Sequence, residues 1–269
     1  MNKQTSIGFL GCGNMGGAIL EGMLSNQLHE PGEVLVCEHS EQRRTHWAAL
    51  GVQVTAAAED LQGLESLVIA VKPQAFPEAA GQLGLLEQAA LTISVMAGIH
   101  SDQISDALGP EARVVRVMPN TPCAIRMGIS AVAPGVGCTP ADLEETLELM
   151  ATVGEVVTVD EDAMHAVTAT SGSGPAYLFY LAEAWIEAAT NAGLAPEVAH
   201  KLVIETIHGS AALLRQDGDP ESLRAKVTSP GGTTAAGIQQ LEKQELRAAM
   251  QAAVEAARAR GIELGRGDG

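Results

Sequence analysis

The sequence predicts an α/β domain with a doubly wound, mainly parallel sheet, followed by an all-helical domain. Up to about residue 160, short apolar runs alternate with stretches of helical length. This alternation is typical of a parallel sheet that is covered by helices on both faces. Beyond residue 160 the alternation stops and only helical stretches follow. We therefore expect two domains, at residues 1–160 and 161–269.

Each element of this plan has its own local pattern. The strands of the first domain are continuous apolar runs at Ser6–Leu10, Glu33–Cys37, Ser66–Val71, Leu91–Val95 and Arg113–Met118. The helical stretches between them are Met15–Leu24, Glu41–Leu50, Ala75–Leu86 and Ser101–Leu108. The second domain should hold helices at Glu161–Thr170, Pro175–Ala192, Pro196–Arg215, Pro220–Lys226, Thr234–Lys243 and Leu246–Gly261. Several of these stretches start near a proline, whose missing N–H is tolerated in the first turn of a helix.

One expected helix, at residues 176–192, is apolar around most of its circumference. It carries Tyr177, Phe179, Tyr180 and Trp185 among other apolar residues. Such a helix needs cover on nearly every side. The other helices of the second half could supply this cover, and helices of a partner subunit could do so equally well. We favour the partner subunit and expect an intertwined homodimer.

Composition and charge narrow the classes of partner. The formal net charge of −17 repels polyanions, so we expect neither nucleic acid nor a membrane surface as a partner. The chain opens without a signal-peptide pattern, and its apolar runs are shorter than a membrane span. The cysteines and histidines lack metal-ligand spacing. We expect a cytoplasmic protein with free thiols and no bound metal.

A glycine-rich turn follows the first apolar run. The segment Gly11-Cys12-Gly13-Asn14-Met15-Gly16 has the Gly-x-Gly-x-x-Gly spacing between a strand and a helix. In the Rossmann fold such a turn lets the backbone approach a pyrophosphate, which binds to the free amides of the helix N-terminus. We therefore expect a nicotinamide dinucleotide cofactor.

The residues after the second apolar run leave the choice between NAD and NADP open. Glu38 stands where an acidic residue binds the ribose hydroxyls of NAD. His39, Ser40, Arg43 and Arg44 follow, and an Arg or Ser there can hold the 2′-phosphate of NADP. Arginines on a helix are also common as plain solvated charges.

Further motifs follow in order along the chain. They are Ala70-Val71-Lys72-Pro73-Gln74, Val117-Met118-Pro119-Asn120-Thr121-Pro122, Ser171-Gly172-Ser173-Gly174-Pro175-Ala176-Tyr177 and Val227-Thr228-Ser229-Pro230-Gly231-Gly232-Thr233-Thr234. With these spacings the whole chain resembles the pyrroline-5-carboxylate reductase family. The resemblance implies an N-terminal Rossmann domain and a C-terminal helical dimerisation domain. It also implies reduction of the cyclic imine 1-pyrroline-5-carboxylate to proline with NADH or NADPH, and assembly into dimers or rings of dimers.

The resemblance also implies roles for particular residues. The dinucleotide would contact Leu10, Gly11, Cys12, Gly13, Asn14, Met15, Gly16, Glu38, Ala70, Val71, Lys72, Pro73 and, near the nicotinamide, Asn120. The imino acid would contact Ser229, Gly231, Gly232, Thr233 and Thr234, with Thr234 at the ring nitrogen. The chain departs from the family at Ala58, where some members have Asn, and at Glu38, where many have Ser or Asn.

The expected chemistry fits these residues. Gly231 to Thr234 precede a helical stretch, so their free amides suit the carboxylate of the substrate. Without the family, the same segment is equally well an ordinary turn between helices with Thr233 as N-cap. Thr234 is the expected catalytic residue, although an alkyl hydroxyl is a poor acid. We assign it to orientation at the imine nitrogen, where it can relay a proton from water.

Two other functions compete with the imine reductase. One is a small hydroxyacid dehydrogenase with the same two-part layout, but these enzymes generally carry a lysine on the long helix that opens the second half, and residues 175–192 contain none. The other is a non-catalytic dinucleotide-binding regulator, which would not need a second small-ligand loop. Asp160, Glu161 and Asp162 are expected to be helix-dipole charges rather than catalytic groups.

Overall fold

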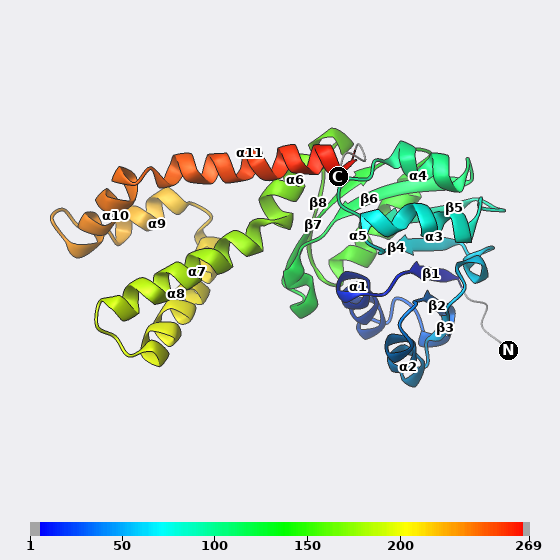
Figure 1. Cartoon of the computed structure of the whole chain (residues 1–269), viewed down its shortest axis with the longest axis horizontal. Coiled ribbons are helices and arrows are strands. Elements are labelled where there is room, and N and C mark those ends of the chain that lie inside the picture. The colour runs from blue at the N-terminus through cyan, green and yellow to red at the C-terminus, as the bar shows by residue number, and fades with distance from the viewer. Residues whose placement is uncertain (1–5, 266–269) are drawn as a thin grey trace. The chain divides into compact units, whose positions relative to one another are not determined.

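The computed structural model describes residues 6–265, which form two compact units (Figure 1). One unit comprises the chain up to Ser173 together with the residues from Ala257 onward, and the other comprises Gly174–Ala256. The predicted order, an α/β half followed by helices, is confirmed. The expected boundary at residue 160 stays a prediction.

The first unit is built on one eight-stranded sheet. Its strands are β1 (Ile7–Leu10), β2 (Val34–Cys37), β3 (Gln53–Thr55), β4 (Ser66–Ile69), β5 (Ala90–Ser94), β6 (Ala112–Met118), β7 (Gly128–Pro134) and β8 (Gly154–Thr158). They lie in the order β3-β2-β1-β4-β5-β6-β7-β8. The first six strands have the Rossmann order, and each of them pairs in parallel with its neighbours among the six. The sheet is extended by β7, antiparallel to β6, and by β8, parallel to β7.

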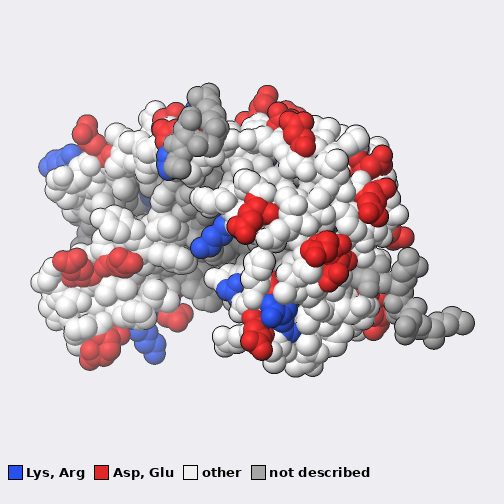
Figure 2. All heavy atoms as spheres, turned by 45° about the vertical axis from the view of Figure 1, so that its right-hand side comes forward, with Lys and Arg blue, Asp and Glu red and all other residues white. Residues whose placement is uncertain are grey.

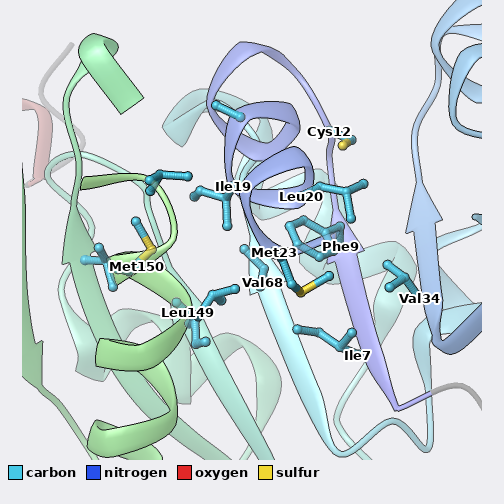
Figure 3. Close-up of a cluster of buried hydrophobic side chains, with 14 of the residues drawn as sticks. Ile7, Phe9, Cys12, Ile19, Leu20, Met23, Val34, Val68, Leu149 and Met150 are labelled. Atoms are coloured by element: carbon cyan, nitrogen blue, oxygen red, sulfur yellow. The ribbon is translucent and has the colours of Figure 1, made fainter. Parts of the chain in front are cut away.

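Helices cover both faces of this sheet. They are α1 (Asn14–Ser25), α2 (Glu41–Ala49), α3 (Phe76–Leu83), α4 (Ser101–Leu108) and α5 (Pro140–Ala151). Figure 3 shows the core on one face, which includes Ile19, Leu20 and Met23 of α1, Leu149 of α5 and Phe9 of β1. A second core cluster lies beneath α3 and α4, on the other side of the sheet. Both faces of the sheet are therefore buried, as the continuous apolar strands predict.

The segment after β8 is less regular than predicted. Instead of one helix over residues 161–170, the chain forms a 3₁₀ turn (Glu161–Ala163), a short α6 (Met164–Val167) and a π-helical turn (Thr168–Gly172). A side chain at Gly172 would meet Met118 Cε at 2.5 Å, so this turn packs directly on β6. Its glycine serves close packing.

The second unit is helical. Its elements are α7 (Gly174–Asn191), α8 (Pro196–Asp217), α9 (Pro220–Lys226), α10 (Thr233–Lys243) and the larger part of α11 (Leu246–Gly265). The predicted helices agree with these bounds within a few residues, and α9 matches at both ends. Few side chains of this unit are buried, and Phe179, Tyr180 and Trp185 of α7 are exposed. Among residues 6–265, no helix is both long and apolar enough to cross a membrane.

Acidic residues dominate the surface charge. Figure 2 shows one face, on which acidic side chains are spread widely and basic side chains stand singly or in small groups. This distribution agrees with the net charge of −17.

Candidate functional site

A cleft of about 800 Å³ lies at the carboxyl ends of β1, β2 and β4. This is where a Rossmann fold binds its dinucleotide. The cleft gathers most of the residues predicted for the cofactor, namely Leu10, Gly11, Gly13, Asn14, Met15, Glu38, Ala70, Val71, Lys72 and Pro73. Ala58, a departure from the family, also lines it. Their contact with a dinucleotide stays a prediction.

Three predicted cofactor residues are not in the lining of this cleft. Gly16 is buried within α1, and Cys12 lines a neighbouring hollow together with Gly13 and Trp47. Asn120, at the end of β6, is buried, and its side-chain oxygen accepts a hydrogen bond from the Ile129 N–H at 3.0 Å. That bond ties the end of β6 to β7.

The glycine turn has a geometry that larger residues do not fit. Gly11 has a φ of +83°, and a Cβ there would meet Val71 Cγ1 at 2.8 Å. A Cβ at Gly16 would meet the Ala70 Cβ and the Gly11 carbonyl oxygen, each at 2.9 Å. The turn therefore brings α1 against β4 and keeps the cleft open for a ligand.

The same turn exposes the N-terminus of α1. Its N-cap is Gly13, which makes no side-chain capping bond, and the first turn of the helix carries no acidic residue. The first backbone N–H groups of a helix lack intrahelical partners and carry positive partial charge. This end of α1 suits a pyrophosphate, and the residues present fit a dinucleotide.

Glu38 lies beside the glycine turn and is 8% exposed. The Cys12 N–H donates to its Oε2 at 3.1 Å, and the Ser40 N–H donates to its Oε1 at 2.9 Å. The Arg43 guanidinium stands 3.5 Å from Oε2. Burial raises the pKa of Glu38, but the two backbone hydrogen bonds and Arg43 outweigh it, so the pKa is lowered overall. The carboxylate is ionised at neutral pH.

Two polar residues that follow Glu38 in the sequence, Ser40 and Arg44, make hydrogen bonds to the backbone. Arg44 donates to the carbonyl oxygens of Glu38 and His39, at 2.7 and 2.8 Å. The Ser40 hydroxyl caps α2 by accepting from the Arg43 N–H at 3.4 Å. Of the residues that left the cofactor choice open, Arg43 and His39 line the cleft.

All four cysteines are free thiols, as predicted. Burial, reinforced by the charge of Glu38, raises the pKa of Cys12 to about 12. The same two causes raise the pKa of Cys37 to about 11. Because the thiolate is the reactive form of cysteine, the raised pKa values disfavour reaction of both thiols at neutral pH.

The segment predicted to bind the substrate forms the turn between α9 and α10. Gly231 has a φ of +71°, and the Gly232 N–H donates to the Ser229 carbonyl oxygen at 3.0 Å. The N-cap of α10 is Gly232 and not Thr233, and it makes no side-chain capping bond. The first amides of α10 therefore remain available to an anion.

The hydroxyls of this turn lie at the surface of the chain. Ser229, Thr233 and Thr234 are exposed. A Cβ at Gly232 would stand 2.6 Å from the Ser229 hydroxyl, so the absence of a side chain there determines where that hydroxyl can sit. The turn thus offers free amides and hydroxyl donors to a small carboxylate. Its contact with the substrate stays a prediction.

Glu161 stands in the first turn of the 3₁₀ turn after β8, as expected for a helix-dipole charge. Its carboxylate also has partners that the sequence did not predict, and the Arg116 guanidinium donates to it at 3.1 Å. The Ser101 N–H and hydroxyl also donate to it, at 2.8 and 2.6 Å. These partners lie 45 and 60 residues away in sequence, so no local pattern reveals them.

The fold and both segments find counterparts in known proteins. Residues 161–264 match the family described as pyrroline-5-carboxylate reductase dimerisation, and residues 6–98 match the family described as NADP oxidoreductase, coenzyme F420-dependent. The pyrroline-5-carboxylate reductase of Synechocystis sp. is 36% identical over 263 residues, which cover 97% of this chain and 98% of the relative.

Solved structures agree with this likeness. A pyrroline-5-carboxylate reductase from Coxiella burnetii has a TM-score of 0.88 at 33% identity and covers 97% of this chain and 99% of its own. The pyrroline carboxylate reductase of Plasmodium falciparum with NADP bound has a TM-score of 0.86 at 28% identity, over 98% and 100% of the two chains. Because the likeness takes in both units and nearly the full length of each relative, the chain belongs to the pyrroline-5-carboxylate reductase family.

Proposed function

We propose that the protein reduces the carbon–nitrogen double bond of 1-pyrroline-5-carboxylate and forms proline. The observation that carries this proposal is the full-length likeness to reductases of that name, at 36% identity for the Synechocystis relative. Two helix N-termini support it, because α1 follows a dinucleotide-type turn and α10 follows a glycine turn suited to a carboxylate.

The reaction needs a hydride on the imine carbon and a proton on the nitrogen. Reduced nicotinamide supplies the hydride when it is bound. A cyclic imine is basic enough to be partly protonated, and the iminium is the better hydride acceptor. The protein's task is then to hold the two reactants in a fixed orientation and to hydrogen-bond the nitrogen.

In this proposal the substrate carboxylate binds the Gly231–Thr233 amides at the start of α10, with Ser229 as a further donor. The Thr234 hydroxyl orients the imine nitrogen and relays a proton from water. The residues that line the α1 cleft, with Cys12, Gly16 and Asn120, hold the dinucleotide. Residues 161–269 form the substrate and dimerisation domain of a homodimer or a ring of dimers. The four free cysteines suit a reducing cytoplasm.

An activity assay tests the proposal. Pyrroline-5-carboxylate is added to the protein with NADH or NADPH, and the loss of absorbance of the reduced nicotinamide is followed. We expect imine-dependent oxidation of at least one of the two cofactors. Binding of a dinucleotide without any imine-dependent oxidation would contradict the proposal and favour the regulator.

The Thr234→Ala variant tests the catalytic assignment. Loss of one group that assists proton transfer costs roughly 10²-fold or more in turnover, while the dissociation constant of the dinucleotide should stay nearly unchanged. Thr206→Ala is the matched control, since it removes an exposed hydroxyl that bonds to the Leu202 carbonyl on α8. If Thr234→Ala turns over like Thr206→Ala, the assignment is wrong.

A further inference from the structure

Glu38 is fixed in place before any ligand binds. Each of its carboxylate oxygens accepts one backbone N–H, from Cys12 of the glycine turn and from Ser40 at the start of α2. The side chain is nearly buried, yet it lines the cleft. An ionised carboxylate has about four acceptor positions, so these two backbone bonds leave capacity for further donors, with Arg43 standing at Oε2.

The charges that line the cleft are few. They belong to Glu38, Arg43 and Lys72, with His39 as a titratable neighbour. Arg43 is the cation beside Glu38, and its guanidinium stands 3.5 Å from the carboxylate. The Arg44 guanidinium instead donates to two backbone carbonyl oxygens. Arg43 is thus the arginine at the Glu38 carboxylate, and it is already paired with that carboxylate.

We propose that Glu38 makes this enzyme selective for NADH over NADPH. The inference rests on the proposed use of a nicotinamide dinucleotide. The unmodified ribose of NADH offers two hydroxyl donors, which match the remaining acceptor capacity of the carboxylate. The 2′-phosphate of NADPH offers only acceptors and carries nearly two negative charges, so it is repelled by an ionised carboxylate that cannot move aside.

Equilibrium binding without the imine tests this inference. The dissociation constants of NADH and NADPH are measured from nicotinamide fluorescence. For the unaltered protein we expect NADH to bind at least about tenfold more tightly, since a single close like-charge contact is worth that much. In Glu38→Ser and Glu38→Gln, the ratio of the two constants should fall by about tenfold or more, chiefly through tighter binding of NADPH.

A second substitution separates the effect of the Glu38 charge from that of the Arg43 charge. In Glu38→Ser, Arg43 loses its partner and becomes free to pair with a 2′-phosphate. Adding Arg43→Gln should therefore abolish most of the gain in NADPH affinity and leave NADH affinity little changed. Glu41→Gln is the matched control: it removes an equal charge from the exposed first turn of α2, outside the cleft, and should leave the ratio unchanged.

The outcomes separate this inference from the proposed function. Equal or tighter NADPH binding by the unaltered protein, or an unchanged ratio in both folded Glu38 variants, overturns the role of Glu38 even if the imine is reduced normally. Selective NADH binding that responds to Glu38 but brings no reduction of the imine contradicts only the proposed function. Thermal unfolding of each variant shows that the compared proteins are folded.

Discussion

At the scale of single residues, the first unit buries the charge of Arg116. The residue belongs to β6 and is 4% exposed. Burial lowers the pKa of its guanidinium, which stays protonated at neutral pH all the same. Glu161 neutralises it, and the same carboxylate accepts two hydrogen bonds from Ser101 at the start of α4. One carboxylate thus joins β6, α4 and the turn after β8.

We expect Glu161→Gln to lower the free energy of unfolding by about 2–4 kcal/mol at neutral pH. The substitution leaves a buried guanidinium without a counter-charge, and this costs more than the loss of the hydrogen bonds alone. Urea unfolding measures the change. Glu144→Gln, an exposed acid on α5, is the control and should stay within about 0.5 kcal/mol. Equal stability of the two variants would show that Arg116 does not depend on Glu161.

The same pair predicts how stability depends on pH. Burial raises the pKa of Glu161, but the hydrogen bonds from Ser101 and Arg116 outweigh it and lower the pKa below the ordinary 4.5. As the pH falls, the Glu161 carboxylate is therefore protonated in the unfolded chain before it is protonated in the folded protein. The stability that Glu161 contributes is fully present above the ordinary pKa and is lost as the pH falls through the lowered pKa of the folded protein. The stability of Glu161→Gln should fall less steeply than that of the unaltered protein as the pH drops below 4.5. If the free energies of unfolding of the two proteins fall in parallel with pH, Glu161 does not contribute in this way.

Residue-scale predictions from the sequence succeeded where neighbours in the chain decide the outcome. The glycine turn is such a case, because Gly11 and Gly16 act within one strand–turn–helix unit. They missed the partners of Glu161, which are distant in sequence. Glu38 lies between the two cases. Its position was predicted, but its backbone donors and its arginine became known only from the folded geometry.

At the scale of elements, the contact of α1 with β4 depends on Gly16. We expect Gly16→Ala to destabilise the protein by about 1–3 kcal/mol, because its Cβ would stand 2.9 Å from Ala70 Cβ and the helix must shift. The shift moves the helix N-terminus, so dinucleotide affinity should fall as well.

Gly81→Ala provides the matched control for this prediction. Gly81 is an exposed residue of α3, and a Cβ there meets nothing within 4 Å. Alanine should therefore stabilise the helix by about 0.5–1 kcal/mol. Calorimetry and dinucleotide titration measure both variants, and a Gly16→Ala protein with unaltered stability and affinity would refute the close-packing argument.

The strands whose burial is complete were all predicted from the sequence. β1, β4 and β5 are buried along their whole length and appear as unbroken apolar runs. Three strands were not predicted. β3 has three residues, β7 opens on glycine and mixes in Ser130, and β8 is half exposed, so none shows a strong strand period. The π-helical turn at Thr168–Gly172 packs against Met118 and was not predicted from the sequence.

At the scale of the whole molecule, the apolar surface of α7 predicts self-association. Phe179 is 58% and Tyr180 74% exposed in the single chain. Clusters of exposed aromatic residues of this kind mark interfaces. We expect Phe179→Glu to shift the protein from dimer or larger towards monomer in sedimentation velocity.

Glu183→Gln is the control for this substitution, because it alters an exposed charge on the same helix. It should leave the sedimentation coefficient unchanged. If the unaltered protein sediments as a monomer at micromolar concentration, the homodimer is refuted.

Function at the molecular scale came from ordered motifs spread over the chain, which carry more information than any single turn. The glycine turn alone fits many dehydrogenases, whereas the segment from Ser229 to Thr234 narrows the choice to one family. The preference between NADH and NADPH did not follow from these motifs. In the sequence alone, Glu38 favours NADH and Arg43 favours NADPH, and only the folded structure shows that the two side chains are paired.

Transfer of isotopic label tests direct reduction of the imine most directly. The protein is mixed with pyrroline-5-carboxylate and NADH that carries deuterium at the transferable position of the nicotinamide ring, and the product is analysed by mass spectrometry. We expect proline with one deuterium on the former imine carbon and none lost to water. Proline without the label, or no proline at all, would contradict it.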